Sequence, residues 1–375
     1  MATPRRLLVD PSRSGVYHCV SRCVRRAFLC GRDAYSGRDF EHRRGWIRDR
    51  LRELSGLFAV EVHSYAVMSN HLHLVVRTLP QEVSGWTAEE VAHRWLWLFP
   101  GRGGKRGRPP EEDAIRALCQ DRSKLASCRE RLADLSWFMR CLNEPIARRA
   151  NREDECTGRF WEGRFKCQKL EDAGAVLACM AYVDLNPIRA GIAETPEQSE
   201  FTSVQDRAVA CRARRQLERA PGDPNPVQAR LIAQARTESH RDDWLAPLGL
   251  PASAGANGSK CRLNSGGMAQ GSAPEAVDPP PMLPTISVER YLELLDWTGR
   301  RIRSGKRGHL SAHLRPALER LDLDVENWVE NVEGFGGLFY RVAGKLRRLR
   351  ERAQAIGRIS LHGHAGARRL YAGAG

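Results

Sequence analysis

The segment Val60–Thr78 reads Val-Glu-Val-His-Ser-Tyr-Ala-Val-Met-Ser-Asn-His-Leu-His-Leu-Val-Val-Arg-Thr. It contains two β-like runs, Phe58–Val67 and His71–Val76, separated by a short polar turn. In the second run His71 and His73 alternate with leucines, and successive side chains of a strand point to opposite faces. The two imidazoles therefore share a face, which suits a divalent metal with positions open for substrate. The alternative is one exposed and one hydrogen-bonded histidine, since His-x-His is a common pattern.

The composition favours a polyanionic partner. The chain has 375 residues with 60 Lys+Arg against 45 Asp+Glu, a formal net charge of +15. A surplus of this size favours nucleic acid, and most of the cations are arginines, whose planar fork suits phosphates and base edges. Membrane-surface binding is the competing interpretation, but no basic amphipathic helix stands out.

The cysteines and the hydropathy indicate an intracellular protein. The 11 cysteines are an odd number, are scattered, and include no C-x-x-C pair, so we expect reduced thiols. No apolar run approaches the length of a membrane span, and no secretory signal is recognised at the N-terminus. We expect a cytoplasmic, nucleoid-associated protein without a membrane partner.

The order of predicted elements indicates an α+β fold. A strand at Gly15–Cys23 and a helix at Asp39–Leu57 precede the two β-like runs, and a strand at Phe165–Leu170 and a helix at Asp172–Leu185 follow later. This order predicts a small antiparallel sheet with helices on one face. A further helix is expected at Thr87–Phe99, where Thr87 and Glu90 form a capping-box pattern.

The chain divides by composition into three parts. Residues 1–206 form the α+β domain, with a helical and basic insertion at 86–133. Residues 207–284 are an arginine-rich helix and a linker rich in Gly, Ser, Ala and Pro, which we expect to be mobile. Residues 285–375 are expected to form a small all-α, basic C-terminal domain.

Two arginine-rich stretches are candidates for DNA contact. The loop Pro100–Pro110 is rich in Gly and Pro, and Thr157–Phe165 alternates aromatic residues with arginines between two glycines. Cations lie along phosphates and aromatic rings stack on bases. The alternatives are a solvated linker for the first stretch and a buried aromatic edge strand for the second. The candidate DNA-binding residues are Arg102, Lys105, Arg106, Arg108, Arg159, Trp161 and Arg164.

A tyrosine late in the domain is a candidate nucleophile. Tyr182 and Asn186 are four residues apart, so on a helix they share one face. A phenolate can attack phosphorus and form a phosphotyrosine, which divides a difficult step into two. Two imidazoles and one side-chain oxygen could hold Mg²⁺ or Mn²⁺ with positions left for phosphate and water. The alternative is a core tyrosine followed by an ordinary Asn-Pro helix terminator.

Three motifs together resemble a known family. They are Ser-Tyr-Ala-Val-Met-Ser-Asn-His-Leu-His-Leu at Ser64–Leu74, Gly-Arg-Phe-Trp-Glu-Gly-Arg-Phe at Gly158–Phe165, and Ala-Tyr-Val-Asp-Leu-Asn-Pro-Ile-Arg-Ala-Gly at Ala181–Gly191. Over roughly residues 15–205 the chain resembles the IS200-like tyrosine-HUH transposases, and more closely the REP-associated tyrosine transposases. The resemblance implies a ferredoxin- or RRM-like HUH domain. The insertion and the C-terminal helices depart from the short members of the family.

The resemblance also implies roles for single residues. His71 and His73 would be the paired metal ligands, and Tyr182 the nucleophile that becomes linked to a DNA 5′ phosphate and leaves a free 3′ hydroxyl. Asn186 stands where related transposases often have Gln, and would be the third ligand. His18 and Tyr65 are interpreted as structural.

These observations lead to one main hypothesis and two others. The main one is a metal-dependent single-stranded DNA endonuclease and strand transferase that acts on hairpin or palindromic DNA as a monomer or homodimer. The first alternative is a non-catalytic DNA- or RNA-binding regulator on the same scaffold. The second is a metal hydrolase in which Tyr182 takes no part.

Overall fold

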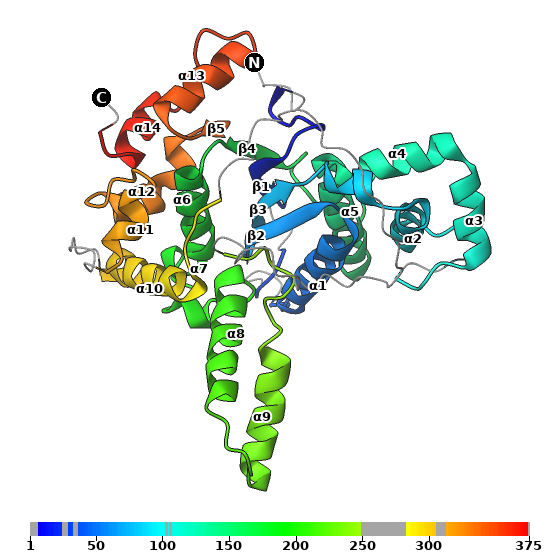
Figure 1. Cartoon of the computed structure of the whole chain (residues 1–375), viewed down its shortest axis with the longest axis horizontal. Helices are drawn as coiled ribbons and strands as arrows, with labels where there is room; N and C mark the ends of the chain where they lie inside the picture. Colours follow the sequence, from blue (N-terminus) through cyan, green and yellow to red (C-terminus); the bar gives the residue numbers. More distant parts are fainter. Residues whose placement is uncertain are drawn as a thin grey trace.

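The chain forms a mixed α+β structure around a five-stranded sheet (Figure 1). The structure is a computed structural model, and it describes residues 7–24, 29–32, 37–101, 104, 107–248, 283–304 and 313–373. The strand order is β2-β3-β1-β4-β5, antiparallel except for the parallel pair β4–β5. The strands are β1 (Gly15–Arg22), β2 (Val60–Val67), β3 (His71–Thr78), β4 (Lys166–Leu170) and β5 (Val342–Ala343).

The helices surround this sheet and extend beyond it. Those that precede β4 are α1 (His42–Leu57), α2 (Ala88–Leu98), α3 (Glu112–Gln120), α4 (Arg122–Ala133) and α5 (Leu135–Glu153). Those that follow it are α6 (Ala173–Asp184), α7 (Asn186–Arg189), α8 (Ser203–Glu218), α9 (Pro226–Glu238), α10 (Val288–Ser304), α11 (Arg315–Glu319), α12 (Trp328–Leu338), α13 (Leu346–Ala355) and α14 (His364–Leu370). Among the described residues, short 3₁₀ helices lie at Glu82–Gly85 and Pro196–Gln198.

The α+β class and the main elements agree with the prediction from sequence. The four long strands lie within two residues of their expected positions. Helix α2 begins after Thr87, whose side chain accepts a hydrogen bond from the Glu90 N–H while the Glu90 side chain accepts one from the Thr87 N–H. This is the capping box expected from the sequence, and it satisfies two backbone donors that the helix itself cannot.

The expectation that helices cover only one face of the sheet is wrong. Leu74 and Val76 of β3 pack in one hydrophobic cluster with α1, α2 and α5. Val75, between them, points the other way and packs in a second cluster with α6 and the C-terminal helices. Strand β3 is therefore covered by helices on both faces of the sheet. Figure 1 shows α1 and α5 on one side of the strands and α6 on the other.

The C-terminal part is not the separate all-α domain that its composition predicts. Strand β5 extends the sheet by pairing with β4, so this part contributes to the central sheet. Its apolar residues also belong to the same hydrophobic cluster as α6. The expected linker falls largely on residues 249–282, which lie outside the described residues.

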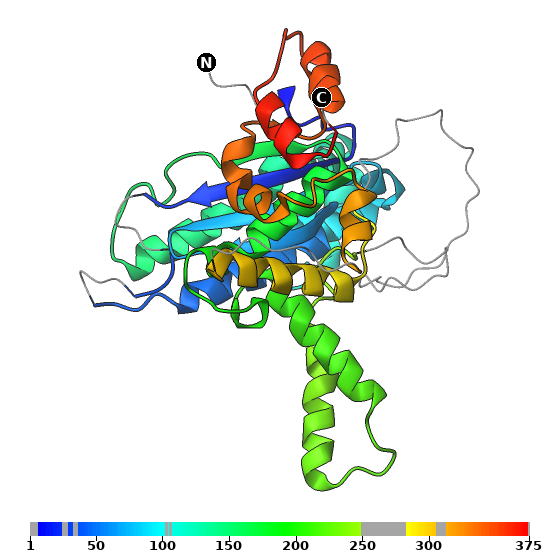
Figure 2. The same cartoon turned by 90° about the vertical axis from the view of Figure 1, so that its left-hand side faces the viewer.

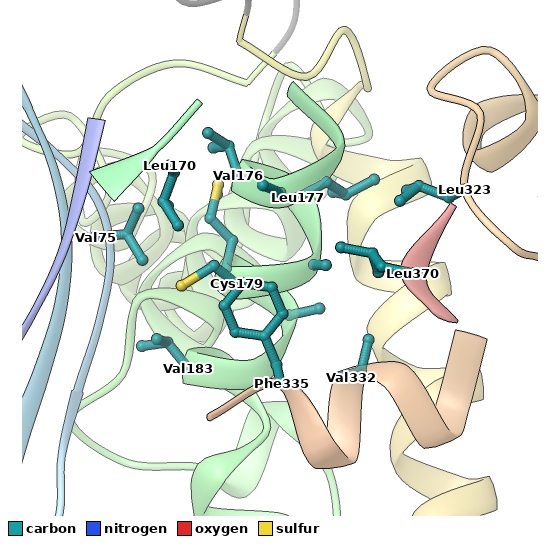
Figure 3. Close-up of a cluster of buried hydrophobic side chains, with 14 of the residues drawn as sticks. Val75, Leu170, Val176, Leu177, Cys179, Val183, Leu323, Val332, Phe335 and Leu370 are labelled. Carbon is teal, nitrogen blue, oxygen red and sulfur yellow. The ribbon is translucent and has the colours of Figure 1, made fainter. Parts of the chain in front are cut away.

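Helix α6 is buried on all sides (Figure 3). Val183 and Cys179 pack near the sheet residue Val75, while Val332 and Phe335 of α12 approach the helix from the other side. Of its twelve residues only Tyr182 is not buried. Helix α6 is therefore not the amphipathic helix of a two-layer fold, because the C-terminal helices form a third layer over it.

Two carboxylates, the half-buried Asp172 and the buried Asp184, join the ends of α6 to the C-terminal part. Asp172, the N-cap, accepts a hydrogen bond from the Tyr371 hydroxyl. Asp184, in the last turn, accepts one of 2.7 Å from the Tyr291 hydroxyl and another from the Ser203 hydroxyl. Hydrogen bonds to buried charged groups contribute more than those between neutral groups, so these bonds anchor both ends of the helix.

Helices α8 and α9 project away from the rest of the molecule, as Figures 1 and 2 both show. Helix α9 carries two exposed apolar side chains, Val227 and Leu231. Across the described parts of the chain, no helix has both the length and the apolar character needed to cross a membrane.

The burial of Asp184 predicts a pH dependence of stability. Burial raises the pKa of Asp184 from 3.8 to about 6, so the folded state binds this proton more tightly than the unfolded state. The stabilisation is complete below pH 3.8 and is lost as the pH rises through about 6. At 1.36 kcal/mol per pKa unit the loss is about 3 kcal/mol.

This effect can be measured by urea unfolding of the wild type and of Asp184→Asn, each at about pH 4 and about pH 7. Over that pH range the free energy of unfolding should fall by about 2–3 kcal/mol more in the wild type than in the variant, since Asn cannot titrate. Asp223→Asn, at an exposed position, should behave as the wild type does. Equal losses in wild type and Asp184→Asn would contradict the prediction.

Candidate active site

Three histidines from two neighbouring strands meet on the α6 face of the sheet. In the antiparallel register of β1 and β3, His73 is opposite Val20 and Val75 is opposite His18. The His71 and His73 rings are 4.7 Å apart between centroids, and the His18 ring stacks on that of His73 at 5.2 Å. The shared face predicted for His71 and His73 is confirmed, and His18 joins them from β1.

Hydrogen bonds engage the same ring nitrogen in the two β3 histidines. His71 Nδ1 lies 2.6 Å from the Asn70 side-chain oxygen, and His73 Nδ1 lies 2.9 Å from His18 Nε2. A ring nitrogen that donates such a bond leaves the lone pair on the other one. His71 therefore presents Nε2 to a ligand, and His73 does so in the tautomer in which its Nδ1 donates to His18.

The electrostatic environment keeps these rings neutral. Burial lowers the pKa of His71 to about 4, and Arg22, opposite it in the register, acts in the same direction. Burial lowers the pKa of His73 well below its usual value, with further contributions from its histidine neighbours and from Arg189. Neutral imidazole is the form that binds metals.

Tyr182 lies beside the histidines. Its ring centroid is 5.6 Å from that of His73 and 6.0 Å from that of His18, with the rings nearly perpendicular in both pairs. The side chain is half-buried. Phe335 of α12 packs against it with ring centroids 6.0 Å apart. The structure thus brings together the predicted nucleophile and the predicted metal-binding pair.

Helix α12 approaches the Tyr182 hydroxyl at a glycine. A Cβ built on Gly336 would lie only 2.7 Å from the phenolic oxygen, closer than a real Cβ comes to another heavy atom. Gly336 is itself exposed, so the hydroxyl lies near the surface at this point.

Asn186 is close to Tyr182, but its oxygen is already engaged. The residue is buried at the start of α7, and its Oδ1 accepts a 3.1 Å hydrogen bond from Arg189 Nη1. The Arg189 guanidinium carbon lies 4.6 Å from the centroid of the Tyr182 ring. The predicted third ligand therefore contacts a cation in this structure.

The donor set fits a divalent ion in part. His71 and His73 provide two neutral nitrogens on one face of a rigid strand, which is suitable chemistry. In the described residues no group of three or more His, Cys, Asp or Glu side chains could hold a metal ion. A third protein ligand would have to be an amide oxygen, and that of Asn186 faces Arg189.

The arginine–aromatic stretch lies one strand away from His71. The Glu162 N–H donates to the Arg22 carbonyl, and Trp161 forms a bridge with Cys23, so this stretch continues the edge of β1. Arg159 and Arg164 are exposed there. Trp161 is half-buried, and its indole N–H donates to the Asn143 carbonyl at 2.9 Å. The two arginines are available to a ligand, and Trp161 is partly held by the protein.

The basic loop of the insertion is not part of this cluster. Arg108 is exposed and follows α2, which packs in the cluster on the other face of the sheet. Arg102, Lys105 and Arg106 lie outside the described residues. Their role in DNA binding stays a prediction.

Two residues of the cluster were missed by sequence reasoning. His18 was interpreted as structural, because the strand pairing that places it against His73 cannot be read from one sequence. Arg189 is part of the Asn-Pro-Ile-Arg motif, three residues after Asn186, and this spacing was a usable signal for their contact.

Comparisons with known proteins give one loose likeness. No family model and no curated protein matches the chain. A solved structure of a REP-associated tyrosine transposase bound to a REP hairpin is similar over 56% of this chain and 86% of its own, with 13% identity and a TM-score of 0.32. A likeness at that level carries no argument about function, so the family remains a resemblance and the site is interpreted from its own geometry.

The contact at Gly336 predicts that a single methyl group displaces the phenol. Gly336→Ala should move the Tyr182 side chain and lower any reaction of its hydroxyl roughly 10-fold or more, since small misplacements of reacting groups have large effects on rate. Gly337→Ala is the matched control, because nothing lies within 4 Å of the added Cβ. Both substitutions favour the helix by up to about 1 kcal/mol.

Two measurements test this prediction. The rate at which a covalent protein–DNA adduct forms reports the position of the phenol, and thermal unfolding shows whether each variant is folded. Equal rates for the two variants, both folded, would show that α12 does not set the position of the phenol.

Proposed function

We propose that the protein is a DNA-cleaving and strand-transferring enzyme of the tyrosine-HUH transposase type. The observation that carries this proposal is the position of the Tyr182 ring, 5.6 Å from that of His73, which in turn lies 4.7 Å from that of His71. A structural tyrosine would need no such neighbours. A nucleophile needs a phosphate-orienting group beside it.

The reaction would proceed by attack of the Tyr182 oxygen on a DNA phosphorus atom. A new P–O bond to the phenol forms, the bond from phosphorus to the 3′ oxygen breaks, and the DNA 5′ phosphate becomes linked to the protein. The phenol gives up its proton and the departing 3′ oxygen takes one up. Attack by a 3′ hydroxyl on the phosphotyrosine reverses the step and joins strands.

His71 and His73 would hold Mg²⁺ or Mn²⁺ at this site. The chemistry that such an ion supplies is polarisation of a phosphate oxygen and stabilisation of transition-state charge. The protein contributes the fixed direction of the two Nε2 atoms, through the bonds of their Nδ1 atoms to Asn70 and His18. It also contributes a buried helix that holds the phenol.

The substrate we propose is single-stranded DNA next to a hairpin or palindrome. The half-buried phenol is more accessible to a flexible single strand than to a rigid duplex. Arg159 and Arg164, which are exposed one strand away from His71, would contact its phosphates. Hairpin preference itself comes from the family resemblance.

A non-catalytic nucleic-acid-binding regulator is the second candidate. The observation in its favour is the close approach of α12 to the Tyr182 hydroxyl at Gly336. Such a protein would use the same basic surface, and its binding would not depend on His71 or Tyr182.

A covalent-adduct assay separates the two candidates. The protein is incubated with labelled hairpin DNA carrying single-stranded flanks and Mn²⁺, and the products are run on denaturing gels. Wild type should give a slowly migrating labelled adduct, whereas Tyr182→Phe and His71→Ala should give none. Tyr340→Phe, at an exposed tyrosine, should retain it. An adduct that persists in Tyr182→Phe, or its absence in the wild type, overturns the nuclease proposal.

Salt dependence tests the arginine–aromatic stretch. The double variant Arg159→Gln/Arg164→Gln should weaken single-stranded DNA binding and reduce the slope of log K against log salt by about 1.4, at about 0.7 per phosphate contact. The control Arg347→Gln/Arg348→Gln removes two cations from α13 and should leave the slope unchanged. An unchanged slope in the first variant would show that these arginines do not contact phosphate.

A further inference from the structure

The cluster around Tyr182 contains cations and neutral groups. Arg22, opposite His71 in the strand pair, forms an ion pair of 3.6 Å with Glu162. Arg189 lies against the ring of Tyr182, and no carboxylate among the described residues pairs with it. The residues expected to ligate an ion, His71, His73 and Asn186, are uncharged. The charge of Arg189 would therefore have to be balanced by a ligand.

Arg189 has unused hydrogen-bonding capacity. Its Nη1 donates to Asn186 Oδ1, while its Nε is buried without a hydrogen-bond partner. Within the described ranges no carboxylate forms an ion pair with it, and its guanidinium carbon lies 4.6 Å from the centroid of the Tyr182 ring. Guanidinium groups bind phosphate through two parallel N–H bonds.

We propose that Arg189 binds the scissile phosphate and makes divalent-metal binding depend on that phosphate. This inference rests on the proposed function and deepens it. The Arg189 guanidinium lies against the Tyr182 ring, which packs beside His73, so its positive charge would oppose binding of a divalent ion by His71 and His73. A phosphodiester between them has oxygens for both. It draws Arg189 away from Asn186, whose oxygen then becomes available as a ligand.

The consequence is cooperativity. Metal and phosphate each bind weakly alone and strengthen each other by the same factor, since coupling between two ligands is reciprocal. Among the described residues no carboxylate or further histidine joins His71 and His73 as a metal ligand. Under this proposal the substrate phosphate supplies the missing ligand.

Mn²⁺ titration followed by electron paramagnetic resonance tests the coupling without any turnover. The probe for the substrate is dimethyl phosphate, a monoanionic phosphodiester, compared with chloride at equal ionic strength. With the full-length wild-type chain, Mn²⁺ affinity should rise about 5-fold or more when dimethyl phosphate is present, the usual lower range of coupling. Titrations of Mn²⁺ in dimethyl phosphate without protein correct for direct association.

Variants assign the coupling to Arg189. Arg189→Gln keeps a donor for Asn186 but removes the charge, so it should bind Mn²⁺ more tightly than wild type in chloride and lose the response to dimethyl phosphate. Arg189→Lys keeps the charge and should keep a reduced response. Arg212→Gln, which removes an exposed cation on α8, should match the wild type.

The outcomes separate this inference from the proposed function. Mn²⁺ binding that His71→Ala abolishes, but that ignores dimethyl phosphate and Arg189, overturns the inference and leaves the metal site in place. A wild type that binds no Mn²⁺ under either condition overturns both. A phosphate response that persists unchanged in Arg189→Gln assigns the coupling to another residue and also overturns the inference.

Discussion

The structure depends on covering one apolar helix from both sides. Eleven of the twelve residues of α6 are buried, and a helix that is apolar all round is stable in water only when it has no solvent face. The sheet covers one side through residues such as Val75, and α12 covers the other through Val332 and Phe335. At about 25 cal/mol per Å² of apolar surface, exposing either side would cost several kcal/mol. The C-terminal helices are therefore an integral part of the fold that carries the candidate site.

The candidate site follows from this constraint and from strand register. His71 and His73 lie on the same face of β3 as Val75, which packs with α6. The antiparallel register of β3 with β1 adds His18 to this face. The last turns of α6 then bring Tyr182 to these rings. The hydrogen bonds at Asp172 and Asp184 fix both ends of the helix and so limit its sliding along the sheet. The position of the phenol is thus set by packing over the whole length of α6.

Sequence reasoning predicted the local structure and part of the site. Strand alternation gave the shared face of His71 and His73, and the capping box gave the start of α2. The Asn-Pro pair does not end helical structure, because α6 ends at Asp184 and Asn186 begins α7. Sequence reasoning also failed where the answer depends on distant segments. An apolar helix reads the same whether one layer or two cover it, so the third layer was missed. Strand pairing is non-local, so the contact of His18 with His73 had no local signal.

Helix α12 covers α6 and still leaves Tyr182 accessible, and the glycines of α12 show how. Gly334, Gly336 and Gly337 each cost a helix up to about 1 kcal/mol relative to alanine, yet only Gly336 faces a near neighbour, the Tyr182 hydroxyl. The apolar residues that cover α6, Val332 and Phe335, lie one turn and one residue before it. Burial of α6 and space for its phenol therefore come from different positions of one helix. It follows that the C-terminal part can stabilise the fold fully while leaving the candidate nucleophile the least buried residue of its helix.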